Sequence, residues 1–159
     1  MSDVFTKSKR SEVMSHIRSR GNKETELALA ALFRRQNISG WRRHVEIKIA
    51  KKAAKSRRPN IGVKESKVRS FKVRPDFVFP KLRLAVFVDG CFWHACPKHS
   101  TQPKGNAAFW RKKISGNQIR DRLVSRTLRR NGWQVLRIWE HELVRRNEDR
   151  LIRRLRKEI

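Results

Sequence analysis

The sequence contains no apolar stretch of the length that a membrane-spanning helix needs, which is about 20 residues. The first ten residues, MSDVFTKSKR, are charged and have no apolar core of the kind that defines a signal peptide. These two absences argue against a membrane protein and against a secreted one. We therefore expect a cytoplasmic protein.

Cysteine is also scarce. The chain has two cysteines, Cys91 and Cys96, and His94 and His99 are interleaved with them. In a secreted protein such a pair would suggest a disulfide. Because no export signal is expected and histidines alternate with the cysteines, a metal site with thiolate ligands is favoured.

Acidic residues are few. Asp and Glu total 14 against 41 Lys and Arg, which gives a net charge of +27. Such a surface attracts polyanions and releases counterions when it binds phosphates, so nucleic acid is the expected partner and the bacterial nucleoid the expected place. An anionic membrane fits less well, because the basic residues do not follow one long amphipathic helix. A ribosomal or packaging protein would carry similar charge, but five Trp and eight Phe argue against a pure coating role.

The densest basic segment covers residues 48–72, where ten Lys or Arg accompany one acid, Glu65. Pro59 and Gly62 break any regular helix or strand there. The segment is either a solubilising insertion or an arm that contacts phosphates, and its charge density favours the arm. The residues expected to contact DNA are Lys51, Lys52, Arg57 and Arg58, together with Lys112 from a later helix.

The spacing of apolar residues predicts an α/β fold. Strands are expected at residues 45–49, 77–79, 82–88 and 133–139, and helices at 11–19, 22–36, 106–131 and 142–158. The faces expected to be buried are Leu27, Ala28, Ala31 and Leu32 in the second helix, Ile119, Leu123, Val124 and Leu128 in the third, and Leu143, Leu151, Ile152 and Leu155 in the last.

The order of these elements also predicts their topology. The short break between 77–79 and 82–88 indicates a hairpin, and the run LAVFV at 84–88 is apolar on both faces, as in a central strand. Strand, long helix and strand imply a crossover that leaves 133–139 parallel to 82–88. We expect one domain over residues 1–159, with a mixed sheet of three to five strands and helices on both faces.

Two acids, Asp76 and Asp89, flank the predicted hairpin and would meet at one end of the sheet. Held together, they could bind a hard cation such as Mg²⁺, with water and a substrate phosphate completing its ligands. The alternative is that both are turn acids, as Pro-Asp and Asp-Gly pairs often are. The basic surroundings favour metal-dependent phosphodiester hydrolysis.

The stretch VFVDGCFWHACPKH offers three metal ligands, Cys91, Cys96 and His99, whereas a structural zinc site takes four. His94 and the distant His141 are the candidates for the fourth. If strand 133–139 is parallel to 82–88, His141 lies beside the Cys91 loop, and this topology favours His141. The alternatives are a loop histidine at position 99 and a surface histidine at 141.

The same topology leaves His94 free for proton transfer. An imidazole that titrates near neutral pH can accept a proton from an attacking water. Phe92 and Trp93 precede it in a crowded loop. They would either wedge between DNA bases or cover the zinc site.

These motifs, taken in order, resemble a known family. RPDFVF, VFVDGCFWHACPKH, NAAFWRKKISGNQIRDR and GWQVLRIWEHEL resemble the very short patch repair DNA mismatch endonucleases of the PD-(D/E)xK nuclease superfamily, closely over residues 73–144 and loosely over 1–44. The resemblance implies a restriction-endonuclease-like core with a mixed sheet, Mg²⁺ catalysis and one structural zinc. It also implies nicking of double-stranded DNA 5′ to the thymine of a T:G mismatch, which arises from deaminated 5-methylcytosine.

The resemblance assigns roles by motif position. It makes Asp76 the metal-binding aspartate, the Val88 carbonyl a second ligand, His94 the catalytic histidine and Asp121 the acid that orients it. It further places Glu26 near the active site, Phe92, Trp93 and Trp110 in an aromatic wedge, and Cys91, Cys96, His99 and His141 at the zinc. We expect a monomer, with other mismatch-repair proteins as further candidate partners.

The sequence departs from the family pattern at several positions. Asp89 stands where some members have histidine, the zinc set has two cysteines and two histidines, and the basic segment 48–72 is additional. The lysine of the superfamily is absent, so proton transfer falls to His94. Two other functions stay open: a zinc-stapled, basic DNA-binding protein without nuclease activity, and a related nickase with another DNA specificity.

Overall fold

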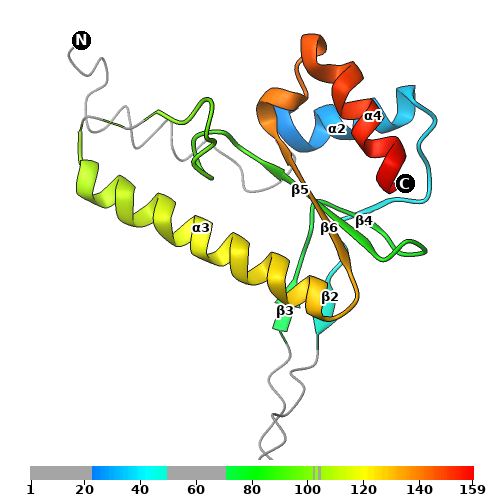
Figure 1. Cartoon of the computed structure of the whole chain (residues 1–159), viewed down its shortest axis with the longest axis horizontal. Coiled ribbons are helices and arrows are strands. Elements are labelled where there is room, and N and C mark those ends of the chain that lie inside the picture. Colours follow the sequence, from blue (N-terminus) through cyan, green and yellow to red (C-terminus); the bar gives the residue numbers. More distant parts are fainter. Residues whose placement is uncertain (1–22, 50–70, 102, 104) are drawn as a thin grey trace, which may run out of the picture.

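A computed structural model describes residues 23–49, 71–101, 103 and 105–159 of the chain. It has a four-stranded mixed sheet with helices on both faces, as predicted, and a separate two-stranded ribbon (Figure 1). The expected helix at 11–19 and the residues expected to contact DNA, Lys51, Lys52, Arg57 and Arg58, lie outside the described residues. No helix in the described part is both long and apolar enough to span a membrane.

The large sheet has the order β1-β4-β5-β6, with β1 at Arg42–Arg43, β4 at Phe77–Phe79, β5 at Leu84–Asp89 and β6 at Gln134–Trp139. The β4–β5 hairpin is antiparallel and sets Phe77 opposite Val86. Strand β6 runs parallel to β5 and sets Trp139 opposite Asp89. The predicted hairpin, central strand and parallel crossover are therefore confirmed.

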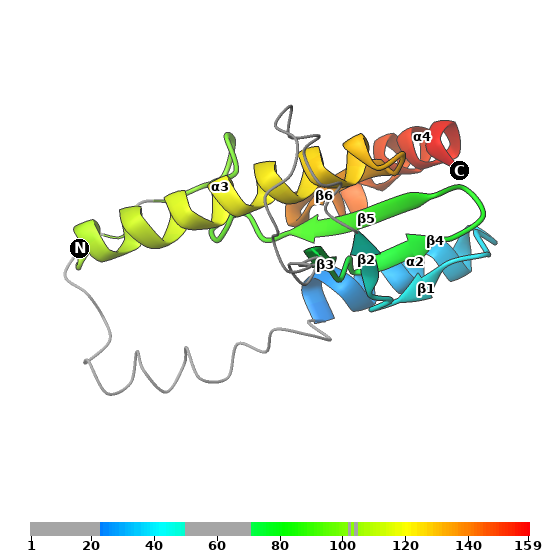
Figure 2. The same cartoon turned by 90° about the horizontal axis from the view of Figure 1, so that it is seen from below.

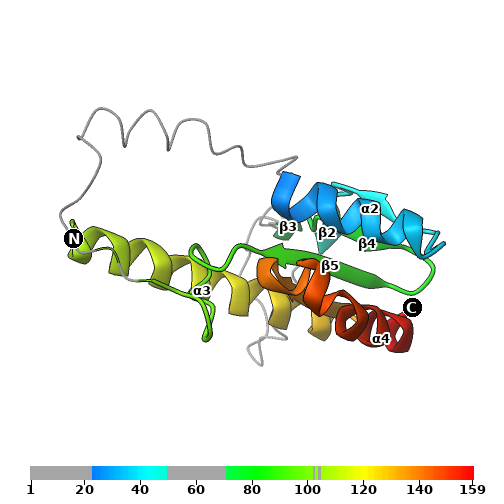
Figure 3. The same ribbon diagram turned by 90° about the horizontal axis from the view of Figure 1, so that it is seen from above.

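The core on one face of the sheet lies under α2 (Ala28–Arg35) and α4 (Glu148–Glu158), which both lie on that side in Figures 1 and 3. Phe33 of α2 contacts Phe77 and Phe79 edge-on, with ring centroids 5.3 and 5.6 Å apart. Two short 3-10 turns precede α4, so the last helix begins at Glu148 rather than near residue 142. Three of the predicted apolar side chains, Leu151, Ile152 and Leu155, are buried, whereas Leu143 lies before the helix and is partly buried against the same core.

The opposite face is covered by α3 (Ala107–Arg130) and by the ribbon of β2 (Ile47–Ile49) and β3 (Phe71–Val73). Ile47, Ile49 and Val73 pack with Leu128 of α3 against this face. Lys48 of β2 pairs with Lys72 of β3. The basic segment thus begins and ends on adjacent strands of one ribbon.

The predicted buried faces of two helices were partly wrong. In α2 the buried residues include Leu29 and Phe33, because Phe33 packs on β4 and turns that face of the helix toward the sheet. Leu27 is exposed and ends the preceding π-helical turn, η1 (Lys23–Leu27). In α3, Ile119 and Leu123 are 59% and 53% exposed. Ile119 lies about half a turn around the helix from the buried Leu128. The N-terminal half of α3 also extends beyond the sheet (Figures 1 and 2).

Truncation of Phe33 tests this core. We expect Phe33→Ala to lower the free energy of unfolding by about 3–5 kcal/mol, because the ring is fully buried against β4. Phe109→Ala is the matched control, since that ring is 60% exposed, and it should change stability by about 0.5 kcal/mol or less. Urea denaturation measures both, and equal losses would contradict the described packing.

Candidate active site and metal centre

A cavity of about 660 Å³ opens where β4 and β5 meet, and it is lined by Asp76, Asp89 and Glu26. Asp76 comes directly after Pro75 at the start of β4, and its Oδ2 accepts a hydrogen bond of 2.7 Å from the Val88 amide. The pKa of Asp76 is raised to about 6: partial burial raises it most, the Val88 hydrogen bond and Arg137 lower it, and the charges of Glu26 and Asp89 add to the rise. The cavity therefore concentrates negative charge around a partly buried carboxylate.

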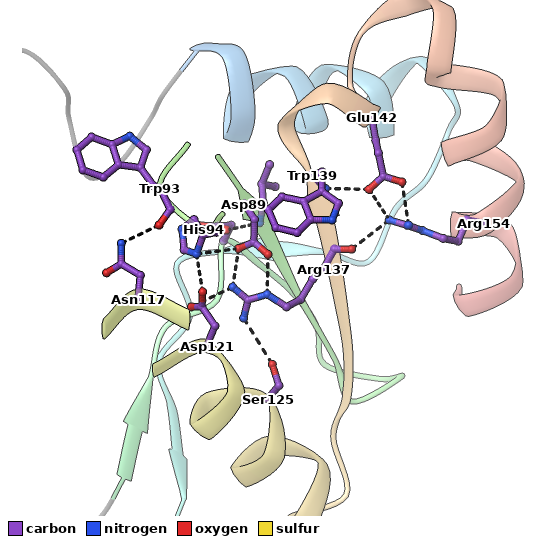
Figure 4. A network of polar contacts seen from close by, with 12 residues as sticks. Asp89, Trp93, His94, Asn117, Asp121, Ser125, Arg137, Trp139, Glu142 and Arg154 are labelled. Carbon is purple, nitrogen blue, oxygen red and sulfur yellow. Dashed lines mark hydrogen bonds and ion pairs between the residues drawn. The ribbon is translucent and has the colours of Figure 1, made fainter. Parts of the chain in front are cut away.

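His94 and Asp121 face each other across this cavity. His94 lies in the loop after β5, Asp121 lies on α3, and Nδ1 of the imidazole is 2.5 Å from Oδ2 of the carboxylate (Figure 4). Asn117, one turn earlier on α3, donates to the Trp93 carbonyl at 2.9 Å and ties the loop to the helix. The histidine and the acid expected to orient it are thus in contact.

Asp89 has a partner that the sequence did not predict. Arg137, from β6, donates through Nε to Asp89 Oδ2 at 2.6 Å and through Nη2 to Oδ1 at 2.5 Å (Figure 4). The one available signal was a single charged residue within the apolar strand WQVLRIW, which needs a buried acid nearby. Asp89 is 3% exposed. Its role as a Mg²⁺ ligand stays a prediction, and the pairing of both of its oxygens with Arg137 does not favour that role.

Glu26 also borders the cavity and is buried. Its Oε2 lies 2.9 Å from Nη2 of Arg43 and 3.2 Å from Nε2 of His44. The backbone amide of His44 donates to the Asp76 carbonyl at 3.3 Å. The expected proximity of Glu26 to the site is therefore found, and Arg43 and His44 are additional neighbours.

A second cluster lies beside the first and consists of Cys91, Cys96, His99 and His141, whose ligand atoms all lie within 4.8 Å of one another. Cys91 Sγ is 3.2 Å and Cys96 Sγ 3.6 Å from Nδ1 of His141, and Cys96 Sγ is 3.8 Å from Nδ1 of His99. The parallel pairing of β5 and β6 brings His141 here, as predicted. His94 is not part of this cluster.

The donor spacing of the Cys/His cluster fits a tetrahedral cation. Metal–sulfur bonds of about 2.3 Å and metal–nitrogen bonds of about 2.0 Å place ligand atoms roughly 3.3–3.8 Å apart. Both cysteines are free thiols, and burial raises the pKa of Cys91 to about 11. A bound cation would lower that pKa, because the thiolate is the form that binds metal.

Backbone contacts hold this cluster in place. Glu140 accepts a hydrogen bond of 3.0 Å from the Cys91 amide. Asn147 donates to the His141 carbonyl at 2.6 Å. The first contact joins the loop after β5 to the turn after β6, and the second holds that turn itself in place.

The aromatic residues predicted to act together do lie together. The rings of Phe92, Trp93 and Trp110 contact one another with centroids 5.2–5.8 Å apart. Trp110 is on the extended half of α3, as is the exposed Lys112. Trp93 also lines the cavity, whose rim includes the basic residues Lys72, Arg74, Lys113 and Arg120.

Comparison with known proteins relates the chain to one group of enzymes. Residues 62–101 match the family model described as DNA mismatch endonuclease Vsr. The chain is 33% identical to the Type II nicking enzyme V.NmeAIP of Neisseria meningitidis serogroup A, over 98% of both proteins.

Other relatives match over shorter stretches. The Type II nicking enzyme V.NaeI of Lentzea aerocolonigenes is 54% identical over 45% of this chain and 43% of its own length. The DNA mismatch endonuclease Vsr of Escherichia coli K12 is 41% identical over 42% of this chain and 44% of its own length. The chain thus matches a little under half the length of each of these two relatives.

The raised pKa of Asp76 predicts a pH-dependent stability in magnesium-free buffer. The folded pKa of about 6 exceeds the unfolded value, which is about 3.9. The contribution of the protonated carboxyl to the free energy of unfolding is complete below about pH 3.9 and is lost as the pH rises through about 6. Asp76→Asn should therefore be more stable than wild type by on the order of 1–3 kcal/mol at pH 7.5, and less so toward pH 4.

Urea denaturation between pH 4 and pH 7.5 measures this difference. Asp149→Asn, at an exposed carboxylate on α4, is the control and should show no comparable gain with rising pH. A stability difference between Asp76→Asn and wild type that stays constant across this range would contradict the expected titration.

Proposed function

Because this chain belongs to the family of the DNA mismatch endonuclease Vsr, we propose that it nicks double-stranded DNA 5′ to the thymine of a T:G mismatch, with Mg²⁺ as catalytic cation. The reaction would begin the repair of deaminated 5-methylcytosine in the bacterial cytoplasm. The proposal includes a single restriction-endonuclease-like domain that acts as a monomer, with other mismatch-repair proteins as possible partners in the pathway.

One observation carries the proposal: the His94–Asp121 pair lies on the same cavity as the partly buried carboxylate of Asp76. Asp121 contacts Nδ1, which leaves Nε2 of His94 for the proton of an attacking water. Asp121 fixes the ring orientation and stabilises the imidazolium that forms. Proton transfer and phosphate binding are thereby assigned to neighbouring side chains.

Asp76 and the Val88 carbonyl are the proposed Mg²⁺ ligands. The residues fit a hard cation, because Asp76 is partly buried near Glu26 and Asp89 and its pKa is raised to about 6, so its charge lacks full compensation. When bound, Mg²⁺ would supply positive charge against the scissile phosphate. Glu26, held by Arg43, shapes the floor of the same cavity.

We assign zinc to the Cys/His cluster, because its donor set of two thiols and two imidazoles is one that structural zinc sites use. The cluster anchors the loop that carries Phe92, Trp93 and His94. A closed metal site of this kind makes that loop rigid, and rigidity keeps the imidazole in the orientation that catalysis needs.

DNA contacts are assigned to two kinds of residue. Basic residues on the cavity rim, Lys112 and the segment that contains Lys51, Lys52, Arg57 and Arg58 would contact phosphates and set the register. The aromatic cluster of Phe92, Trp93 and Trp110 would insert at the mismatch, where unstacking costs least.

A nickase with a different DNA specificity is the second candidate. It is favoured by the relatives named Type II nicking enzymes and by the basic segment that interrupts the ribbon. A DNA-binding protein without nuclease activity is the third, and the first experiment below separates all three.

The proposed reaction predicts nicking that depends on Asp76. With Mg²⁺, the wild-type protein should nick a T:G duplex and spare the matched T:A and C:G duplexes at the same salt concentration. Asp76→Ala should nick at least about 100-fold more slowly, whereas Asp149→Ala, an exposed acid on α4, should match wild type. Denaturing electrophoresis of labelled strands measures the rate. Equal nicking of matched duplexes would favour the second candidate, and binding without nicking the third.

The zinc assignment predicts about one tightly held zinc per purified chain. His141→Ala should lower zinc retention during dialysis against a chelator, because it removes one of the clustered donors. His94→Ala is the matched control and should retain zinc, since His94 contacts Asp121 instead. Elemental analysis provides the measurement. Loss of zinc from the His94 variant with retention in the His141 variant would reassign the fourth ligand.

A further inference from the structure

We propose that Arg137 is a positioning residue, which fixes the Asp121–His94 pair and holds Asp89 away from the catalytic cation. The inference rests on the proposed nicking function and deepens it. Its structural basis is a chain of contacts that runs from β6 through Arg137 to the imidazole of His94.

The contacts form a series. Nη2 of Arg137 forms an ion pair with Asp121 Oδ1 at 3.1 Å, and the other oxygen of Asp121, Oδ2, contacts His94 Nδ1 at 2.5 Å (Figure 4). The guanidinium and the imidazole thus bind opposite oxygens of one carboxylate. With both oxygens held, the carboxylate cannot rotate about its Cβ–Cγ bond without breaking a charge-assisted hydrogen bond.

Arg137 is itself held on several sides. It lies opposite Phe87 in the β5–β6 register, and its guanidinium lies 5.0 Å from the centroid of that ring. Nη1 is 3.5 Å from Ser125 Oγ on α3, and the Arg137 backbone carbonyl accepts a 3.1 Å hydrogen bond from Arg154 of α4. The guanidinium thus contacts β5 and α3, while α4 binds the backbone of its strand, and such support keeps its partners in place.

Arg137 also determines which of two nearby carboxylates accepts the hydrogen bond from His94. Nδ1 of His94 lies 3.6 Å from Asp89 Oδ1 and 2.5 Å from Asp121 Oδ2, so two carboxylates compete for one imidazole. The bidentate contact with Arg137 satisfies Asp89 and leaves Asp121 as the acceptor. Burial raises the pKa of Asp121, but the hydrogen bond from His94 and the charge of Arg137 outweigh burial and lower it, so this acceptor stays ionised.

The same bidentate contact separates Asp89 from the cation. Both Asp89 oxygens face a guanidinium, and a divalent cation on the same carboxylate would be repelled by that charge. Asp76, whose contact with Val88 is made by one oxygen, is not paired in this way. The two acids of the hairpin thus have different roles: Asp76 binds the cation, and Asp89 binds Arg137 and helps to hold it in place.

The first test measures single-turnover nicking of a T:G duplex at saturating DNA and Mg²⁺. Arg137→Gln should lower the rate by about 10- to 100-fold, the range typical of residues that orient a ligand or base, and should leave the DNA dissociation constant unchanged. Arg137→Lys should recover part of the rate. Arg83→Gln is the matched control, because Arg83 ties the far end of α3 to the sheet through the Asn131 carbonyl. An unchanged rate in Arg137→Gln overturns the proposal.

A double-mutant cycle separates positioning from a merely structural effect. If Arg137 acts through Asp121, then Arg137→Gln should cost nothing further in an Asp121→Asn background. Independent, multiplicative losses overturn the proposal. Because Arg137→Gln leaves Asp89 buried without its partner and could unfold the chain, Asp89→Asn/Arg137→Gln repeats the cycle without an unpaired charge.

Two further readouts complete the design. Asp89→Asn should leave the Mg²⁺ concentration for half-maximal rate unchanged, whereas Asp76→Asn should raise it. A similar rise in both overturns the division of the two acids.

Independently of nicking, the proton NMR signal of the His94 Nδ1–H should be lost in Arg137→Gln and kept in Arg83→Gln. An unchanged signal in Arg137→Gln overturns the proposal, while failure of wild type to nick any duplex would count against the proposed function alone.

Discussion

The parallel pairing of β5 with β6 is the constraint on which both centres of this protein depend. It sets the carboxyl ends of the two strands side by side, with Asp89 opposite Trp139. The Cys/His cluster joins the loop that leaves β5 to the turn that leaves β6. Two residue pairs earlier, Phe87 lies opposite Arg137, whose guanidinium reaches Asp89. A shift of one residue would turn Arg137 to the other face and break the acid–base network.

The two centres share a short loop and divide its tasks. Cys91 and Cys96 fix its ends, while the residues between them face the cavity and the extended half of α3. Such an arrangement couples the integrity of the Cys/His cluster to the orientation of His94. The turn hydrogen bonds within the loop, from His94 to Gly90 and from Cys96 to Cys91, add to this support.

The scarcity of acids makes those at the site conspicuous. In a chain with 41 basic and 14 acidic residues, Glu26, Asp76, Asp89 and Asp121 all line one cavity. Three of them contact arginine or histidine side chains, whereas the carboxylate of Asp76 bonds to a backbone amide. The positive field of the chain would draw DNA toward this cavity, and the pairing within it leaves Asp76 as the acid best suited to a cation.

The sequence by itself determined the strands β2, β4, β5 and β6, the hairpin and the crossover, because apolar periodicity and turn residues are local properties of the chain; it did not predict the short strands β1 and β3. It also determined the candidate residues Asp76, His94, Asp121 and His141, through motif spacing and family resemblance. It did not determine that Arg137 binds Asp89, or which faces of α2 and α3 are buried. Those depend on register and helix phase between elements far apart in the chain, such as the 48 residues between Asp89 and Arg137. The chain has many arginines that could pair with Asp89, and only tertiary packing places Arg137 beside it. Because Asp89 is buried, its charge would be costly without such a partner.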